Sequence, residues 1–171
     1  MNPKDARSNS IAYNGCGCLA LLIFIGIIIA AVLPSFLHRG NRSPLSESKQ
    51  YVSSMSKGQQ AHFLEKGVFT NSIDALGISV KPETTNYKYS IYATEKAAFH
   101  YGISKQKTLK SYVGGVFVVP AKEVDPNAAK DEITTTYILC ETDSPATIEP
   151  AKPIYQNGKV TCGKGTTDLT K

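Results

Sequence analysis

Residues 44–66 read PLSESKQYVSSMSKGQQAHFLEK, and this stretch decides the fold. Ser43 and Pro44 are typical of a helix start, because serine caps the first turn and proline fits the first helical position. Gly67 is typical of a helix end, since glycine readily adopts the left-handed conformation. Helical spacing gives one face for the core, with Leu45, Val52, Met55, Gln59 and Phe63, and a polar face with Glu47, Lys49, Ser53, Lys57 and Gln60. We therefore expect a moderately amphipathic helix over 44–66 that lies on another element.

After this helix, the hydrophobic pattern changes from the period of a helix to that of a strand. Residues 72–77 predict a short helical turn, and beyond Pro82 the alternation places Tyr87, Tyr89 and Ile91 on one face. The glycine pair Gly114-Gly115 predicts a bulge. Strands are predicted at residues 86–93, 97–104, 109–119, 133–140 and 160–162. One helix followed by short strands with brief connections indicates an α+β domain, in which the helix packs on an antiparallel sheet of about four to five strands.

Before the helix, residues 8–37 contain no charged residue, although the whole chain of 171 residues has a net charge of +5 and is 42% hydrophobic. That composition excludes a disordered protein. Residues 18–37 are long enough to cross a bilayer core of about 30 Å as a helix. We expect a short cytoplasmic segment at 1–17, a transmembrane helix at 18–37 and an extracytoplasmic globular domain at 38–171. Two alternatives stay open: a cleaved secretory signal peptide and a buried hairpin helix.

The orientation of this segment is poorly encoded by charge, because basic residues flank it on both sides. Cys140 and Cys162 indicate it instead. A disulfide between them would close a proline-containing surface loop, and such a bond persists outside the cytosol. The alternative is two unrelated free thiols. We expect a single-pass protein of the inner or plasma membrane, with a cytoplasmic N-terminus and a domain in the periplasm or at the cell surface.

Cys16 and Cys18 lie in a Gly-Cys-Gly-Cys run at the expected cytoplasmic edge of the membrane. Cysteines beside a membrane are candidates for S-acylation, so both are possible lipidation sites. The alternative interpretation is that they are small apolar residues of the helix.

The sequence shows no catalytic constellation. The three histidines are far apart, and none has metal-ligand spacing to another histidine or to cysteine: His38, His62 and His100. Four residues of one loop have oxygen ligands suited to calcium, but without the spacing of an EF-hand: Glu123, Asp125, Asn127 and Asp131. A solvated loop and structural histidines are the simpler interpretations. We expect no enzyme activity, no catalytic or metal site, no cofactor and no small-molecule substrate.

Three lysines raise the question of nucleic-acid binding. Lys105, Lys107 and Lys110 lie near Tyr101 and Tyr112, which would give a basic patch with aromatic platforms. The alternative is a solvated hairpin, because the positive charge of the chain is modest and diffuse.

Several stretches resemble one family. Residues 26–37, GIIIAAVLPSFL, are similar to the second half of the hydrophobic helix of type IV pilins. The rest resembles the pilin-like G/H family of cyanobacteria, at residues 48–55, 59–65, 72–77, 86–91 and 165–169 and at the final cysteine pair. The resemblance implies a long N-terminal helix, half in the membrane and half on an antiparallel sheet. It also implies assembly with other pilin-like subunits, in which Gly26, Ala30 and Ala31 allow close helix packing and Pro34 opens the backbone locally.

The resemblance includes two departures at the start of the hydrophobic helix. Pilins carry a peptidase-cleavage glycine and a buried glutamate there, and this sequence has Ala12 and Gly17 at those positions. Tip-type pseudopilins also lack the glutamate. We therefore expect a minor or tip-type subunit of a type IV pilus or of a secretion pseudopilus. The alternative is a secreted or membrane-tethered binding or adhesion module that does not enter a filament.

Overall fold

The computed structural model describes residues 44–170, with side chains from Glu47 onward. The predictions for the transmembrane helix, for the lipidation sites Cys16 and Cys18, and for the packing residues fall outside this range: Gly26, Ala30, Ala31 and Pro34. Within residues 44–170, no helix is both long enough and apolar enough to cross a membrane.

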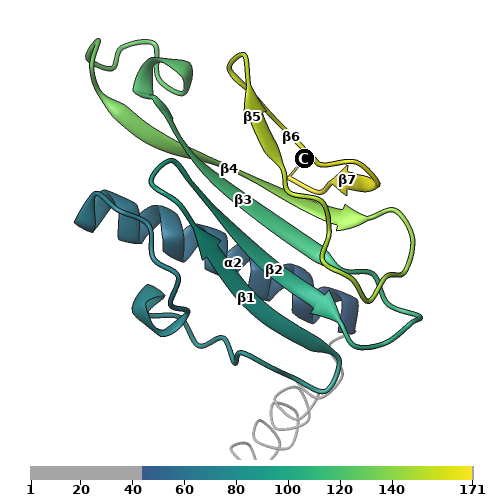
Figure 1. Cartoon of the computed structure of the whole chain (residues 1–171). Coiled ribbons are helices and arrows are strands. Elements are labelled where there is room, and N and C mark those ends of the chain that lie inside the picture. The colour runs from purple at the N-terminus through teal and green to yellow at the C-terminus, as the bar shows by residue number, and fades with distance from the viewer. Residues whose placement is uncertain (1–43, 171) are drawn as a thin grey trace, which may run out of the picture. The chain divides into compact units, whose positions relative to one another are not determined.

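One long helix and seven strands form the described part (Figure 1). The helix is α2 (Pro44–Lys66), and two 3-10 turns follow, η2 (Asp74–Leu76) and η3 (Ala121–Glu123). The longer strands are β1 (Tyr87–Ala93), β2 (Ala97–Ser104), β3 (Tyr112–Pro120) and β4 (Ile133–Thr142). The short ones are β5 (Ile154–Gln156), β6 (Lys159–Thr161) and β7 (Thr166–Asp168).

The main sheet has the order β1-β2-β3-β4-β7, and every neighbouring pair is antiparallel. β5 and β6 form a separate hairpin. The α+β prediction of one helix on an antiparallel sheet is therefore confirmed. Two strands, β5 and β7, were not predicted, because each has three residues and neither shows a clear alternation of apolar and polar side chains.

The helix ends as the sequence predicts. Gly67 has a φ of 71° and donates its N–H to the carbonyl oxygen of Phe63 at 2.7 Å. Four residues of the predicted apolar face are buried against the sheet: Val52, Met55, Gln59 and Phe63. Val52 and Met55 pack in one core cluster with strand residues of the sheet, namely Tyr87, Tyr89, Tyr112 and Leu139.

α2 approaches the sheet closely at two strand glycines. A Cβ atom on Gly102 would lie 2.4 Å from Ser48 Oγ, and one on Gly114 would lie 2.3 Å from Ser56 Oγ. The predicted bulge at Gly114-Gly115 is wrong, because both glycines keep an unbroken register with Leu139 and Ile138 of β4. The strand needs glycine at 114 for helix packing and not for a kink.

The other face of the sheet is covered by the C-terminal segment. Phe99, Tyr101, Val113, Phe117, Ile138 and Cys140 form a second core cluster on this face, and Tyr155, Val160 and Cys162 pack against it. Figure 1 shows the β5–β6 hairpin (yellow) on the side of the sheet opposite α2. The described domain thus has a helix, a sheet and a small disulfide-bonded third layer.

Candidate assembly and binding surfaces

The predicted disulfide between Cys140 and Cys162 is present, with a Cα–Cα distance of 5.8 Å. Cys140 lies in β4 and is fully buried, whereas Cys162 follows β6 directly. The bond therefore attaches the β5–β6 hairpin to the central sheet. The loop that it closes is part of the core and not only a surface excursion.

A buried polar contact joins α2 to β2. Ser56 Oγ donates to the carbonyl oxygen of Val52 at 3.0 Å and lies 3.3 Å from His100 Nδ1. His100 has no exposed surface, and burial lowers its pKa to about 3. A neutral histidine under a helix is a structural group, as the sequence predicted for His100. It cannot meet a substrate from this position.

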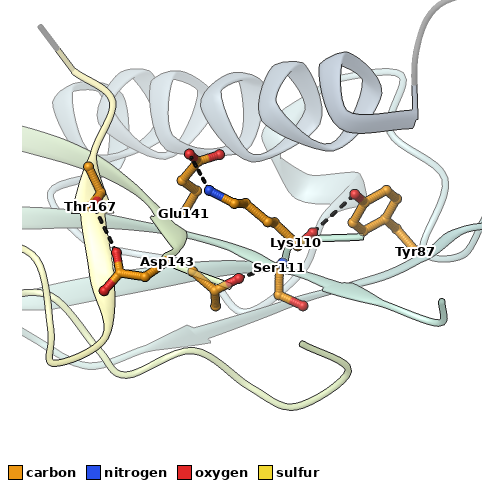
Figure 2. A network of polar contacts seen from close by, with 7 residues as sticks. Tyr87, Lys110, Ser111, Glu141, Asp143 and Thr167 are labelled. Atoms are coloured by element: carbon orange, nitrogen blue, oxygen red, sulfur yellow. Dashed lines mark hydrogen bonds and ion pairs between the residues drawn. The ribbon is translucent and has the colours of Figure 1, made fainter. Parts of the chain in front are cut away.

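A network of polar contacts holds the β2–β3 connection against the ends of β4 and β7 (Figure 2). Tyr87 Oη donates to the carbonyl oxygen of Lys110 at 3.1 Å, and Lys110 Nζ lies 3.0 Å from Glu141 Oε1. Ser111 N–H donates to Thr142 Oγ1 at 3.1 Å. Burial raises the pKa of Tyr87 to about 12, so this phenol stays protonated as a donor. Every member has a partner, which indicates a structural network.

The same network extends to the C-terminal strand. Thr167 Oγ1 of β7 donates to Asp143 Oδ1 at 2.7 Å, just after β4 ends (Figure 2). Leu169 N–H then donates to the carbonyl oxygen of Leu139 at 2.8 Å, and Leu139 N–H donates to Thr170 Oγ1 at 2.9 Å. These contacts fix the chain end to one end of β4.

The three lysines of the predicted basic patch do not form an open cationic surface. Lys105 is paired with Glu83, which holds the pKa of that carboxyl below its ordinary value. Lys110 is paired with Glu141. Within residues 44–170, Lys107 is the member of the three without an ion pair. Nucleic-acid binding stays an untested prediction, and the geometry gives it no additional support.

The acidic loop after β3 is exposed and uses its oxygens internally. Glu123 accepts a hydrogen bond from Tyr155, and Asp125 Oδ1 accepts one from Asn127 N–H at 2.9 Å. In the part of the chain that the structure describes, no group of three or more histidine, cysteine, aspartate or glutamate residues is placed to hold a metal ion. The exposure of residues 122–127 agrees with a solvated loop.

An apolar groove of about 500 Å³ lies across the ends of β2, β3 and β4 beside Tyr155. Its floor and walls are mostly apolar, with Phe117, Val119, Pro120 and Ile133. Ile133 is 58% exposed. This surface was not predicted from the sequence. The one local sign of it is Ile133, an apolar residue directly after the charged residues Asp131 and Glu132. Such exposed apolar area is typical of protein–protein contact sites.

A family model described as Type IV pilin-like G and H matches residues 46–163, which are 118 of the 171 residues. The chain belongs to the Type IV pilin-like G and H family. The match runs from the first turn of α2 to just after Cys162, so it includes all three layers. No curated protein and no solved structure matches the chain.

Membership of this pilin-like family gives a coarse statement of function: the chain is a type IV pilus-related subunit that assembles with other pilin-like subunits. The site geometry agrees with such a role. The polar network around Lys110 and Ser111 is satisfied within the domain, and the apolar surface beside Ile133 suits contact with another protein.

Proposed function

We propose that this protein is a membrane-anchored, non-catalytic pilin-like subunit with a minor or tip-type role in a type IV pilus or a secretion pseudopilus. The observation that carries the proposal is the position of the family match. It begins at residue 46, and residues 38–45 separate it from the charge-free stretch 8–37, so one chain contains an apolar segment followed by the pilin-like domain. Pilin-type assembly uses that combination.

Two features support the location and the minor role. The disulfide between Cys140 and Cys162 suits an oxidising compartment outside the cytosol. At the start of the apolar stretch, Ala12 and Gly17 stand where major pilins carry the cleavage glycine and the glutamate. A subunit without the pairing carboxylate suits the end of a filament better than its repeated middle.

Substitutions in the apolar stretch test the assembly. Gly26→Leu and Ala30→Leu add bulk where close helix approach is needed, so each is expected to remove the protein from sheared filaments while the membrane fraction keeps it. Ile27→Leu preserves volume in the same stretch and is the matched control, expected to co-purify normally. If the two bulky variants co-purified with filaments as well as the control, helix-mediated assembly would be rejected.

The second candidate is a secreted or tethered binding module, favoured by the exposed groove beside Ile133. Mass spectrometry of the mature N-terminus separates the two. A chain that starts near Val32 has lost its anchor and fits the secreted module. A chain that keeps the whole of residues 8–37 fits the membrane subunit.

A further inference from the structure

Within residues 44–170, no strand pairs with the outer edge of β4 along half of its length. β7 pairs only with Cys140, Glu141 and Thr142 of β4, and the contacts of Leu169 and Thr170 extend this cover to Leu139. Ile133–Tyr137 pair with β3 on the inner side. Among residues 44–170, the contacts of this free stretch with α2 come from Gln60, whose Nε2 donates to the carbonyl oxygen of Thr135 at 3.2 Å and to Thr135 Oγ1 at 3.1 Å.

Alternation along the strand identifies the outward groups. Leu139 and Thr135 direct backbone groups away from β3, so in an antiparallel sheet the odd-numbered residues 133, 135 and 137 do the same. Their N–H and C=O groups form a ready template for one more strand.

The opposite edge of the sheet shows how an edge is covered in this domain. Tyr87 exchanges hydrogen bonds with Thr84, at 3.2 Å and 2.8 Å. Tyr89 N–H donates to the carbonyl oxygen of Pro82 at 2.8 Å, and Ala93 N–H donates to Asn71 Oδ1 at 2.7 Å. The segment 71–84 thus closes the β1 edge, and Lys88 adds a charge there. Within residues 44–170, the free part of the β4 edge has one such cover, the contact of Gln60 with Thr135, which is buried, and no flanking segment pairs with it.

The sequence of the open edge, Ile133-Thr-Thr-Thr-Tyr137, has no charge, proline or glycine. Natural proteins usually place such residues on free edges to prevent pairing. We propose that this edge pairs with the same edge of a second copy of the chain, antiparallel, about a two-fold axis at Thr135. The sequence is self-complementary in that register.

The register satisfies both backbone and side chains. Residue 135 faces 135 of the second copy as a hydrogen-bonded pair, and residue 133 faces 137. Ile133 then meets a tyrosine on the α2 side, and Thr134 meets Thr136 on the other side; both are favourable cross-strand pairs. The carbonyl oxygen of Thr135 has two lone pairs, so it can keep Gln60 and accept the new N–H.

Two further features limit the pairing to a dimer. Pairing stops after Tyr137, because Leu139 is already bonded to the C-terminal residues. The β1 edge is covered, so the contact is isologous and closes with two copies. Leu64 lies one helical turn after Gln60 on the same side of α2 and is 72% exposed. In the proposed dimer, the second copy covers this apolar side chain. The two-fold axis makes the two α2 helices run in opposite directions, so the contact joins two copies of opposite orientation. The proposal therefore does not depend on the proposed function.

Charge placement on the edge tests both the contact and its register. Thr134 and Thr136 are partly exposed, and in the proposed dimer each faces the other across the interface at the closest type of pair. T134K/T136E therefore creates opposite charges twice, whereas T134K/T136K and T134E/T136E create like charges twice. Sedimentation of the full chain in mild detergent is expected to show a concentration-dependent dimer. Its dissociation constant should be about tenfold higher for both like-charged variants than for T134K/T136E.

The controls separate register from net charge. The two like-charged variants change the net charge in opposite directions, so a shared weakening cannot come from overall repulsion. S90K adds a second lysine near Lys88 on the covered β1 edge and is expected to leave the dissociation constant unchanged. A full chain that stays monomeric, a dimer with equal constants in all variants, or an equal weakening by S90K would each overturn the proposal.

Discussion

At the scale of single residues, the buried face between α2 and the sheet is the most sensitive part of the domain. Small side chains and glycines set the distance between the layers, and His100 occupies the same contact without solvent. The first feature predicts how added side-chain volume changes stability, and the second predicts how protonation of His100 changes it.

Gly114 tests the close approach of α2. Gly114→Ala places a Cβ atom 2.3 Å from Ser56 Oγ and 3.2 Å from Val52 Cγ1, so we expect it to lower the free energy of unfolding by about 1–3 kcal/mol. Ser56→Ala removes the nearest atom, and the double variant should lose less stability than the sum of the single variants. Urea unfolding of the full chain measures this cycle. Strict additivity would argue against the contact.

His100 makes stability depend on pH. Its pKa is about 3 when folded, below the ordinary value of 6.5, so between these values the unfolded chain binds a proton that the folded chain does not. The stability contributed by neutral His100 is complete above pH 6.5 and is lost as the pH falls. From pH 7 to pH 5 the free energy of unfolding should drop by about 2 kcal/mol from this residue.

The His100→Gln variant is the control for that effect. It keeps a polar side chain beside Ser56 and removes the titration, so its stability should vary less between pH 7 and pH 5 than that of the native chain. An identical pH dependence in the two proteins would show that other groups cause the loss.

At the scale of elements, local signals predict α2 well because its caps and its apolar face lie within one stretch of sequence. The third layer is different. Its strands β5 and β6 have three residues each and are positioned by Cys162 and by contacts with the sheet, and the equally short β7 is positioned by pairing with β4. A glycine in a strand is also ambiguous, since Gly114 fits either a bulge or close packing. The sequence does not show which element approaches it.

Site residues follow the same rule. The Cys140–Cys162 pair could be predicted because two cysteines in a hydrophilic region have few alternatives. The ion pairs of Lys105 and Lys110 could not be predicted, because their partners Glu83 and Glu141 are 22 and 31 residues away in the sequence. The open β4 edge depends on which strands pair, and no local pattern gives that.

At the scale of elements, the disulfide between Cys140 and Cys162 gives a testable prediction. Cys140→Ser/Cys162→Ser should lower the free energy of unfolding by about 3 kcal/mol, since the bond closes a loop with a separation of 22 residues. Hydrogen exchange should become faster in β5, β6 and β7, while α2 and β1–β3 stay protected. Equal loss of protection throughout the domain would contradict a separately attached third layer.

At the scale of the whole molecule, the sequence combines two parts to which we assign different roles: the domain that contains the family match and the charge-free stretch before it. The domain supplies a stable core and exposed apolar surface, and the charge-free residues 8–37 supply the candidate assembly segment. As a member of the pilin-like family, the chain is expected to act through its contacts with other chains.

The most direct measurement of the central claim is quantitative mass spectrometry of filaments sheared from native cells, compared with the membrane fraction of the same cells. A minor pilin-like subunit is expected in the filaments at a small molar fraction of the major subunit, with residues 8–37 retained. Abundant protein in the membrane or in the medium together with its absence from the filaments would contradict the account.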